Sequence, residues 1–146
     1  MRLFTPVIFS SILFVVGCAG NSTVSLTADI NKYQYVVLPN VLSYNGDPEL
    51  MDLEVQIYDA LELTRLTVIG EKEIYSLTED QKQRLLLARF SARQNSDYSR
   101  ISVNFTDYVT GRPVASCYGA YALGFDESGD LDGAMVKVSE EINKLF

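Results

Sequence analysis

The sequence predicts one α/β domain, in which two long helices pack on a mixed, mostly antiparallel sheet of about four to five strands. Three observations carry this prediction. Apolar residues recur at helical spacing over about 48–63 and again from about residue 130 to the C-terminus. Short runs of β-branched and aromatic residues flank these two segments. The length left after the first 31 residues suits a single domain covering 32–146.

The first predicted unit is a strand, a helix and a second strand. Residues 33–41 form an aromatic and β-branched run that Pro39 ends, and its almost continuous apolar stretch favours a strand covered on both faces. Asp47 can cap the following helix, and Pro48 suits its first position. Residues 65–69 then read as a strand that ends at Gly70. This unit is long enough for a right-handed crossover between parallel strands.

The middle of the chain is less regular. Residues 71–77 read as a link with room for a short extended piece. Thr78 and Gln81 match a capping box, which predicts a helical turn over about 78–84. Residues 85–94 fit either an extension of that helix or a strand. We favour the strand, because the strands that follow need a partner.

A hairpin and a helix close the chain. Residues 101–106 alternate, which predicts a half-buried strand with Ile101, Val103 and Phe105 facing inward. Residues 110–113 form a turn, and 114–123 form the second strand, whose small residues leave room for a closely packed helix. A loop at 125–129 leads into the last helix, which Asp126 or Asp130 can cap. This helix presents one apolar stripe: Leu131, Ala134, Met135, Val138, Ile142 and Leu145.

The N-terminus resembles the signal peptide of bacterial lipoproteins. An apolar run that is too short to span a bilayer ends in Val15-Val16-Gly17-Cys18, which resembles a lipobox. The resemblance implies that residues 1–17 are removed, that Cys18 carries three acyl chains, and that residues 18–31 are a short flexible tether. Ala19 stands where an aspartate would retain such a protein in the inner membrane. The resemblance therefore implies attachment to the outer membrane and a bilayer as one partner.

The domain also resembles small envelope lipoproteins: TolB amino-terminal-like domains, the curli-secretion lipoprotein, and lipoprotein activators of penicillin-binding proteins. The resemblance lies in element order and in three segments, Val36-Val37-Leu38-Pro39, Leu66-Thr67-Val68-Ile69 and the hairpin at 107–112. These relatives are binding or assembly modules, so the resemblance implies a non-enzymatic protein with an envelope protein as partner.

Composition excludes several classes of function. Only Arg2 of the 12 basic residues lies in 1–17, so the remaining chain has 11 basic and 19 acidic residues, a formal charge of −8. This negative charge argues against binding of nucleic acid and against electrostatic docking on anionic lipid. The chain has no histidine, which excludes histidine-based catalysis and metal ligation. With Cys18 acylated, Cys117 has no partner for an intramolecular disulfide, and its apolar surroundings favour a buried structural role over a reactive thiol.

Few residues suggest a site. Tyr108 lies beside Thr110, Gly111 and Arg112 at the predicted hairpin tip, and this group is the best candidate for partner binding. Residues 128–133 match a calcium loop poorly, because Ser139 stands where a bidentate glutamate belongs, so helix capping is the better interpretation.

We predict no cofactor, no metal and no catalytic residue. An enzyme would need clustered carboxylates in a cleft. The leading hypothesis is an interaction module, and the alternative is a carrier or sensor of a small ligand, which would need an enclosed apolar pocket.

Overall fold

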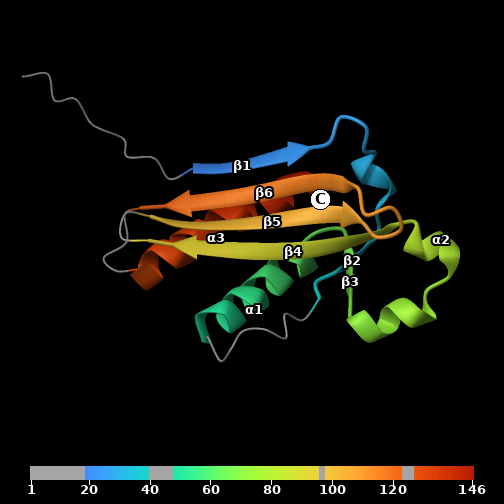
Figure 1. The fold of residues 1–146 in the computed structure, drawn as a ribbon, viewed down its shortest axis with the longest axis horizontal. Helices are drawn as coiled ribbons and strands as arrows, with labels where there is room; N and C mark the ends of the chain where they lie inside the picture. Colours follow the sequence, from blue (N-terminus) through green and yellow to red (C-terminus); the bar gives the residue numbers. More distant parts are fainter. Residues whose placement is uncertain (1–18, 40–47, 96–97, 123–126) are drawn as a thin grey trace, which may run out of the picture.

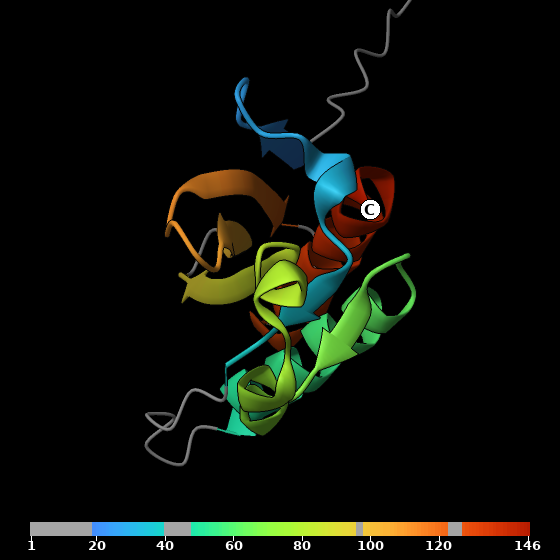
Figure 2. The ribbon, with the colours of Figure 1, turned by 90° about the vertical axis from the view of Figure 1, so that its right-hand side faces the viewer.

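The sheet forms one layer of the molecule, and the two long helices form the other (Figure 1). This computed structural model describes residues 19–39, 48–95, 98–122 and 127–146. The six strands are β1 (Ala19–Val24), β2 (Tyr35–Val37), β3 (Thr67–Ile69), β4 (Leu85–Gln94), β5 (Ser99–Asp107) and β6 (Pro113–Tyr121). Helices α1 (Pro48–Glu62) and α3 (Glu127–Leu145) lie on the same side of this sheet (Figure 2).

The strand order is β1-β6-β5-β4-β2-β3. Strand β2 pairs in parallel with both β3 and β4, whereas the β4–β5, β5–β6 and β6–β1 pairs are antiparallel. The mixed, mostly antiparallel sheet and the two long helices are confirmed. The described residues form six strands rather than four or five.

The sixth strand corrects the prediction of a flexible tether over residues 18–31. Residues 19–24 form β1, which pairs with β6 from Ala19 opposite Ala120 to Val24 opposite Ala115. The Ser22 hydroxyl also donates to Glu141 of α3 at 2.8 Å. Small polar residues carry little strand propensity, but backbone pairing with an available edge needs no particular side chain. A short 3-10 helix, η1 (Ile30–Lys32), follows, with Asp29 as its N-cap.

The main core lies between the sheet and the helices. Ile101, Val103 and Phe105 of β5 are fully buried, as predicted, and 85–94 is the strand that we favoured. The stripe of α3 packs against the same core: Leu131, Ala134, Met135, Val138 and Ile142 are buried and Leu145 is partly buried. Cys117 is buried as well, as predicted. Burial, assisted by the Glu141 carboxylate, raises the pKa of the Cys117 thiol to about 12.

Several local predictions change in detail. Strands β2 and β3 have three residues each, shorter than the runs 33–41 and 65–69 suggested. Residues 71–76 form a 3-10 helix, η2 (Glu71–Ser76), rather than an extended piece, because the Glu73 carboxylate accepts from the Gly70 N–H at 2.7 Å and favours a helical turn. The capping box of Thr78 and Gln81 is confirmed at the start of α2 (Glu79–Lys82).

The start of α3 also differs from the prediction. This helix begins at Glu127, so part of the predicted loop at 125–129 is helical and Asp130 lies inside the helix rather than at its cap. Residues 128–133, considered above as a calcium loop, are helical too. The other candidate cap, Asp126, lies outside the described residues.

Small residues let α3 approach the sheet closely, as predicted. A Cβ atom at Gly119 would lie 2.2 Å from the backbone oxygen of Ala134. At Gly133, a Cβ atom would lie 2.4 Å from the Tyr121 ring. Both positions therefore require glycine for space and not for backbone conformation.

Candidate interaction surface at the β5–β6 hairpin

The turn between β5 and β6 is ordered by Asp107. The Asp107 N–H donates to the Arg112 carbonyl at 2.9 Å, and the Gly111 N–H donates to the Asp107 carbonyl at 2.8 Å. The Asp107 carboxylate accepts from the Thr110 N–H at 2.9 Å and the Thr110 hydroxyl at 3.0 Å. Gly111 closes the turn with a φ of 67°, a conformation that favours glycine. The tip therefore has one defined backbone conformation.

The same carboxylate joins the hairpin to the segment before β2. Lys32 Nζ and the Tyr33 hydroxyl both donate to Asp107 Oδ2 at 2.9 Å. Lys32 Nζ also lies 4.7 Å from the centre of the Tyr33 ring. Asp107 is only 6% exposed, so its charge is compensated almost entirely by these protein groups.

The pKa of Asp107 reflects two opposing effects. Burial alone would raise the pKa of this carboxyl group, but the hydrogen bonds from Thr110, Lys32 and Tyr33 outweigh burial and hold it well below its ordinary value of 3.8. The hydrogen bond to Asp107 raises the pKa of Lys32. The pair therefore remains ionised at neutral pH.

Around the buried Asp107 carboxylate, the tip exposes apolar and aromatic side chains. Val109 is 57% exposed and Tyr108 is 38% exposed. Tyr75 of η2, which is 89% exposed, lines a shallow depression together with Tyr108 and Lys72. A second depression on the tip is lined by Lys32, Asp80, Gln83, Arg84, Asp107, Val109 and Thr110. Exposed aromatic and aliphatic groups on a rigid support are typical of protein-binding surfaces.

The predicted site residues come together here, but their roles differ. Tyr108 is at the surface, whereas Thr110 and Gly111 shape the turn. Arg112 is exposed and lines a groove with Asp29 and Lys32. Cys18, the predicted lipid attachment residue, lies outside the described residues.

Sequence reasoning missed the two residues that organise the surface. An aspartate at the start of a turn commonly binds the backbone two or three residues further on, so Asp107 could have been found from its position. Lys32 gave no such signal, because it lies 75 residues away in the sequence and meets Asp107 only through the fold.

Two further features are absent from the described residues. None of the helices there has the length and hydropathy that crossing a membrane requires. Within the same residues, no three histidine, cysteine, aspartate or glutamate side chains are grouped as metal ligands would be.

Comparisons with known proteins place the chain by its fold. No protein-family model matches the sequence, and no curated protein matches it significantly. Among solved structures, the chain is similar to the PelC dodecamer from Paraburkholderia phytofirmans, with a TM-score of 0.53 and 15% identity over 88% of this chain and 98% of that one. It is also similar to a PDZ domain protein from Parabacteroides distasonis, with a TM-score of 0.56 and 11% identity over 88% of this chain and 35% of that one. At identities this low, the structural similarity shows a shared fold alone.

Proposed function

We propose that this protein is a non-enzymatic envelope lipoprotein, anchored through acylated Cys18, whose β5–β6 hairpin tip binds another envelope protein. The observation that carries the proposal is the tip itself. Val109 and Tyr108 are exposed on a turn that the buried Asp107 carboxylate holds in one conformation. A preformed apolar surface loses little conformational entropy when it binds.

The sheet register supports an anchor at the opposite end of the molecule. Ala19, the residue after Cys18, pairs with Ala120 near the end of β6, whereas the tip precedes the start of that strand. Between the Ala19 and Val24 pairs, the register runs five residues, or about 17 Å, toward the tip. Figure 1 shows the start of β1 and the tip at opposite ends of the sheet. An acylated Cys18 would thus leave the tip pointing away from the bilayer.

The depressions at the tip favour a protein partner over a small ligand. A carrier or sensor would enclose its ligand in a mostly apolar cavity. The depression beside Tyr108 is instead shallow and bordered by Glu71 and Lys72, a mixture typical of the rim of a protein contact. The fold shared with PelC, whose solved form is a dodecamer, is compatible with a role in assembly.

The anchor and the tip can be tested separately. Mass spectrometry of the purified native protein should find Cys18 as an acylated N-terminal residue, and Cys18→Ser should abolish acylation and removal of residues 1–17. A bare thiol at position 18 in the native protein would contradict the lipoprotein proposal.

For the tip, a photoreactive residue at Val109 should crosslink in cells to one envelope protein. Val136 of α3 is equally exposed and provides the control position. The Val109 crosslink should disappear when Tyr108→Ser is added. Equal crosslinking from both positions, or a crosslink that survives Tyr108→Ser, would contradict tip binding.

A further inference from the structure

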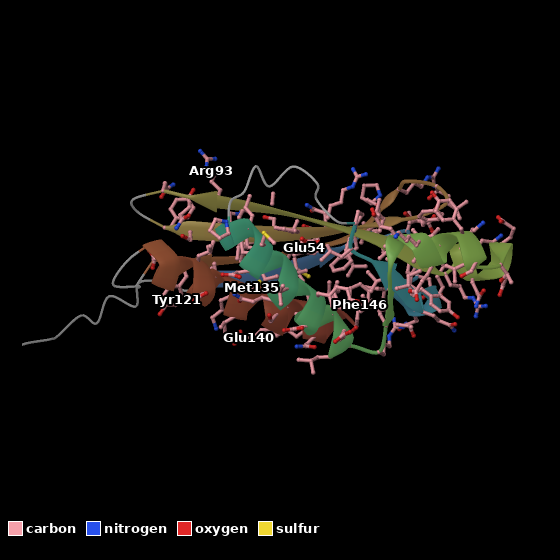
Figure 3. The ribbon with its side chains drawn as sticks, turned by 90° about the horizontal axis from the view of Figure 1, so that it is seen from below. Glu54, Arg93, Tyr121, Met135, Glu140 and Phe146 are labelled. Carbon is pink, nitrogen blue, oxygen red and sulfur yellow. The ribbon has the colours of Figure 1, made fainter. Side chains whose placement is uncertain are left out.

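From Arg89 of β4 across β5, β6 and β1, the face of the sheet turned away from α1 and α3 is not covered by any described element (Figures 1 and 2). Nearer β2 and β3, Ile74 and Leu77 pack on that face over Val37, Ile69 and Leu85. Strands β4, β5, β6 and β1 all contribute to the uncovered part, and the register places its residues in rows across the sheet. These residues are mostly polar: Arg89, Ser91, Arg93, Arg100, Ser102, Asn104, Ser116, Tyr118, Asn21 and Thr23. Arg93 projects on the opposite side of the sheet from the helix that carries Met135 (Figure 3).

This open face is cationic. Arg93 and Arg100 are direct cross-strand partners. Arg89 lies on the same face, four residues before Arg93 in β4. The Arg100 guanidinium lies 4.5 Å from the centre of the Tyr118 ring, which holds it in place. None of these three arginines forms a salt bridge with a carboxylate of the described residues.

Such an arrangement is unfavourable for the isolated chain. Like charges directly opposite each other on a sheet destabilise it. The whole chain has a formal charge of −7, so the residues other than these three arginines carry −10. Positive charge is therefore concentrated on one face of an acidic protein, which favours contact with an acidic surface.

An acidic surface of matching size lies on the other layer of the same molecule. Helix α1 contains no basic residue, and its exposed side carries Asp52, Asp59 and Glu62. Within the described part of the chain, these three carboxylates form no salt bridge either. Between them lies a stripe of exposed apolar residues, namely Met51, Val55 and Tyr58. Exposed apolar residues at helical spacing, bordered by charge, are typical of a helix that packs against a partner.

We propose that the open sheet face of one copy binds the exposed side of α1 of a second copy. The dimensions agree. Arg89 and Arg93 are four strand residues apart, about 13 Å, and Asp52 and Glu62 are ten helix residues apart, about 15 Å. Arginine forks bind carboxylates in a bidentate manner, so each arginine can pair with one acidic residue of α1. Tyr118 and the aliphatic parts of the arginines then cover the apolar stripe.

The two surfaces lie on opposite layers, so the contact is heterologous and leaves one of each surface unused in a dimer. Repetition of the contact gives a closed ring or an open row of copies. This proposal does not depend on acylation of Cys18. If that anchor is present, every copy must direct its Ala19 end toward the same bilayer, which is possible in a cyclic ring standing on the membrane.

Charge reversal tests the contact in the full-length purified protein by sedimentation over a range of concentrations. The wild-type protein should form concentration-dependent assemblies. Arg93→Glu/Arg100→Glu and Asp52→Arg/Asp59→Arg should each raise the dissociation constant about tenfold or more, because like charges then face each other. Lys82→Glu/Lys137→Glu makes the same change in net charge as the first variant, at two exposed ion pairs away from both surfaces, and should leave assembly unchanged.

Mixing provides the decisive measurement. The two charge-reversed variants should assemble together although neither assembles alone, because each supplies the surface that matches its partner. Thermal unfolding of each variant establishes that it is folded. A wild-type protein that stays monomeric at all concentrations, or variants that do not assemble when mixed, would overturn the proposal. So would binding of poly-glutamate to a monomeric wild-type protein with loss of that binding in Arg93→Glu/Arg100→Glu. A failed Cys18 or Val109 test leaves all these results unchanged.

Discussion

At the scale of single residues, Asp107 determines the geometry of the tip. Its carboxylate accepts hydrogen bonds from two segments, namely the turn and the adjacent residues Lys32 and Tyr33. Part of this could be predicted, since an aspartate before Thr110-Gly111 indicates a turn. The contact with Lys32 could not, because it depends on how η1 is placed beside the hairpin. Tyr108 was singled out as a candidate partner contact from its position alone, and the structure places it at the surface of the tip.

Replacing Asp107 should destabilise the protein in a pH-dependent manner. Asp107→Asn should lower the free energy of unfolding by about 2 to 3 kcal/mol at pH 7, since hydrogen bonds to a buried charge are lost. The folded-state pKa of Asp107 is below 3.8, so its contribution is present above pH 3.8 and is lost as pH falls from there toward the lower folded value.

Urea unfolding at several pH values measures this effect. The difference between wild type and Asp107→Asn should shrink progressively below pH 3.8. Asp80→Asn removes an exposed ion pair with Arg84 and serves as control, with an expected loss below about 1 kcal/mol. A difference between wild type and Asp107→Asn that is independent of pH would show that the Asp107 charge does not stabilise the fold.

At the scale of elements, side-chain periodicity predicted what depends on burial. The stripe of α3, the alternation of β5 and the small residues of β6 each indicated the observed packing. Periodicity failed for elements that form through backbone pairing or local hydrogen bonds. Strand β1 is a polar edge strand, and η2 is a short helical link whose first turn is closed by Glu73. Neither element has a periodic apolar pattern in its sequence from which it could have been predicted.

The close approach of β6 and α3 makes a clear prediction. Gly119→Ala should destabilise the protein by about 1 to 3 kcal/mol, because its new methyl group would meet the backbone of α3 at Ala134. Gly70→Ala makes the same change where the nearest atom would be 3.7 Å away, so its effect should be small. Thermal unfolding of both variants measures the difference. Equal melting temperatures would show that α3 can move away from β6 at no cost.

At the scale of the whole molecule, the sheet order depends on contacts that are remote in sequence. The sequence predicted a β2–α1–β3 unit and a β5–β6 hairpin, which are local. It did not indicate that β2 would lie between β3 and β4, or that β1 would join the free edge of β6. Both outcomes are decided by which edges the other strands leave available. The two surfaces of the proposed self-contact likewise become visible only when the strands are placed in register.

The sheet order also predicts how local stability is distributed. Strand β5 pairs on both sides with long strands, whereas β3 is a three-residue edge strand. Backbone amides of Ile101, Val103 and Phe105 should therefore exchange hydrogen most slowly, and those of β3 much faster. Hydrogen exchange followed by mass spectrometry measures both segments in one experiment. Slower exchange in β3 than in β5 would contradict this distribution.

The position of β1 has a mechanical consequence. With a lipid on Cys18, a pull on the anchor would act at Ala19 along the axis of a strand that runs antiparallel to β6. Force in that direction loads all the hydrogen bonds between β1 and β6 in shear at the same time, whereas force across the strands would open them one by one. The hydrogen bonds of the whole first strand would thus carry the load together and resist unfolding of the domain when its lipid anchor is pulled.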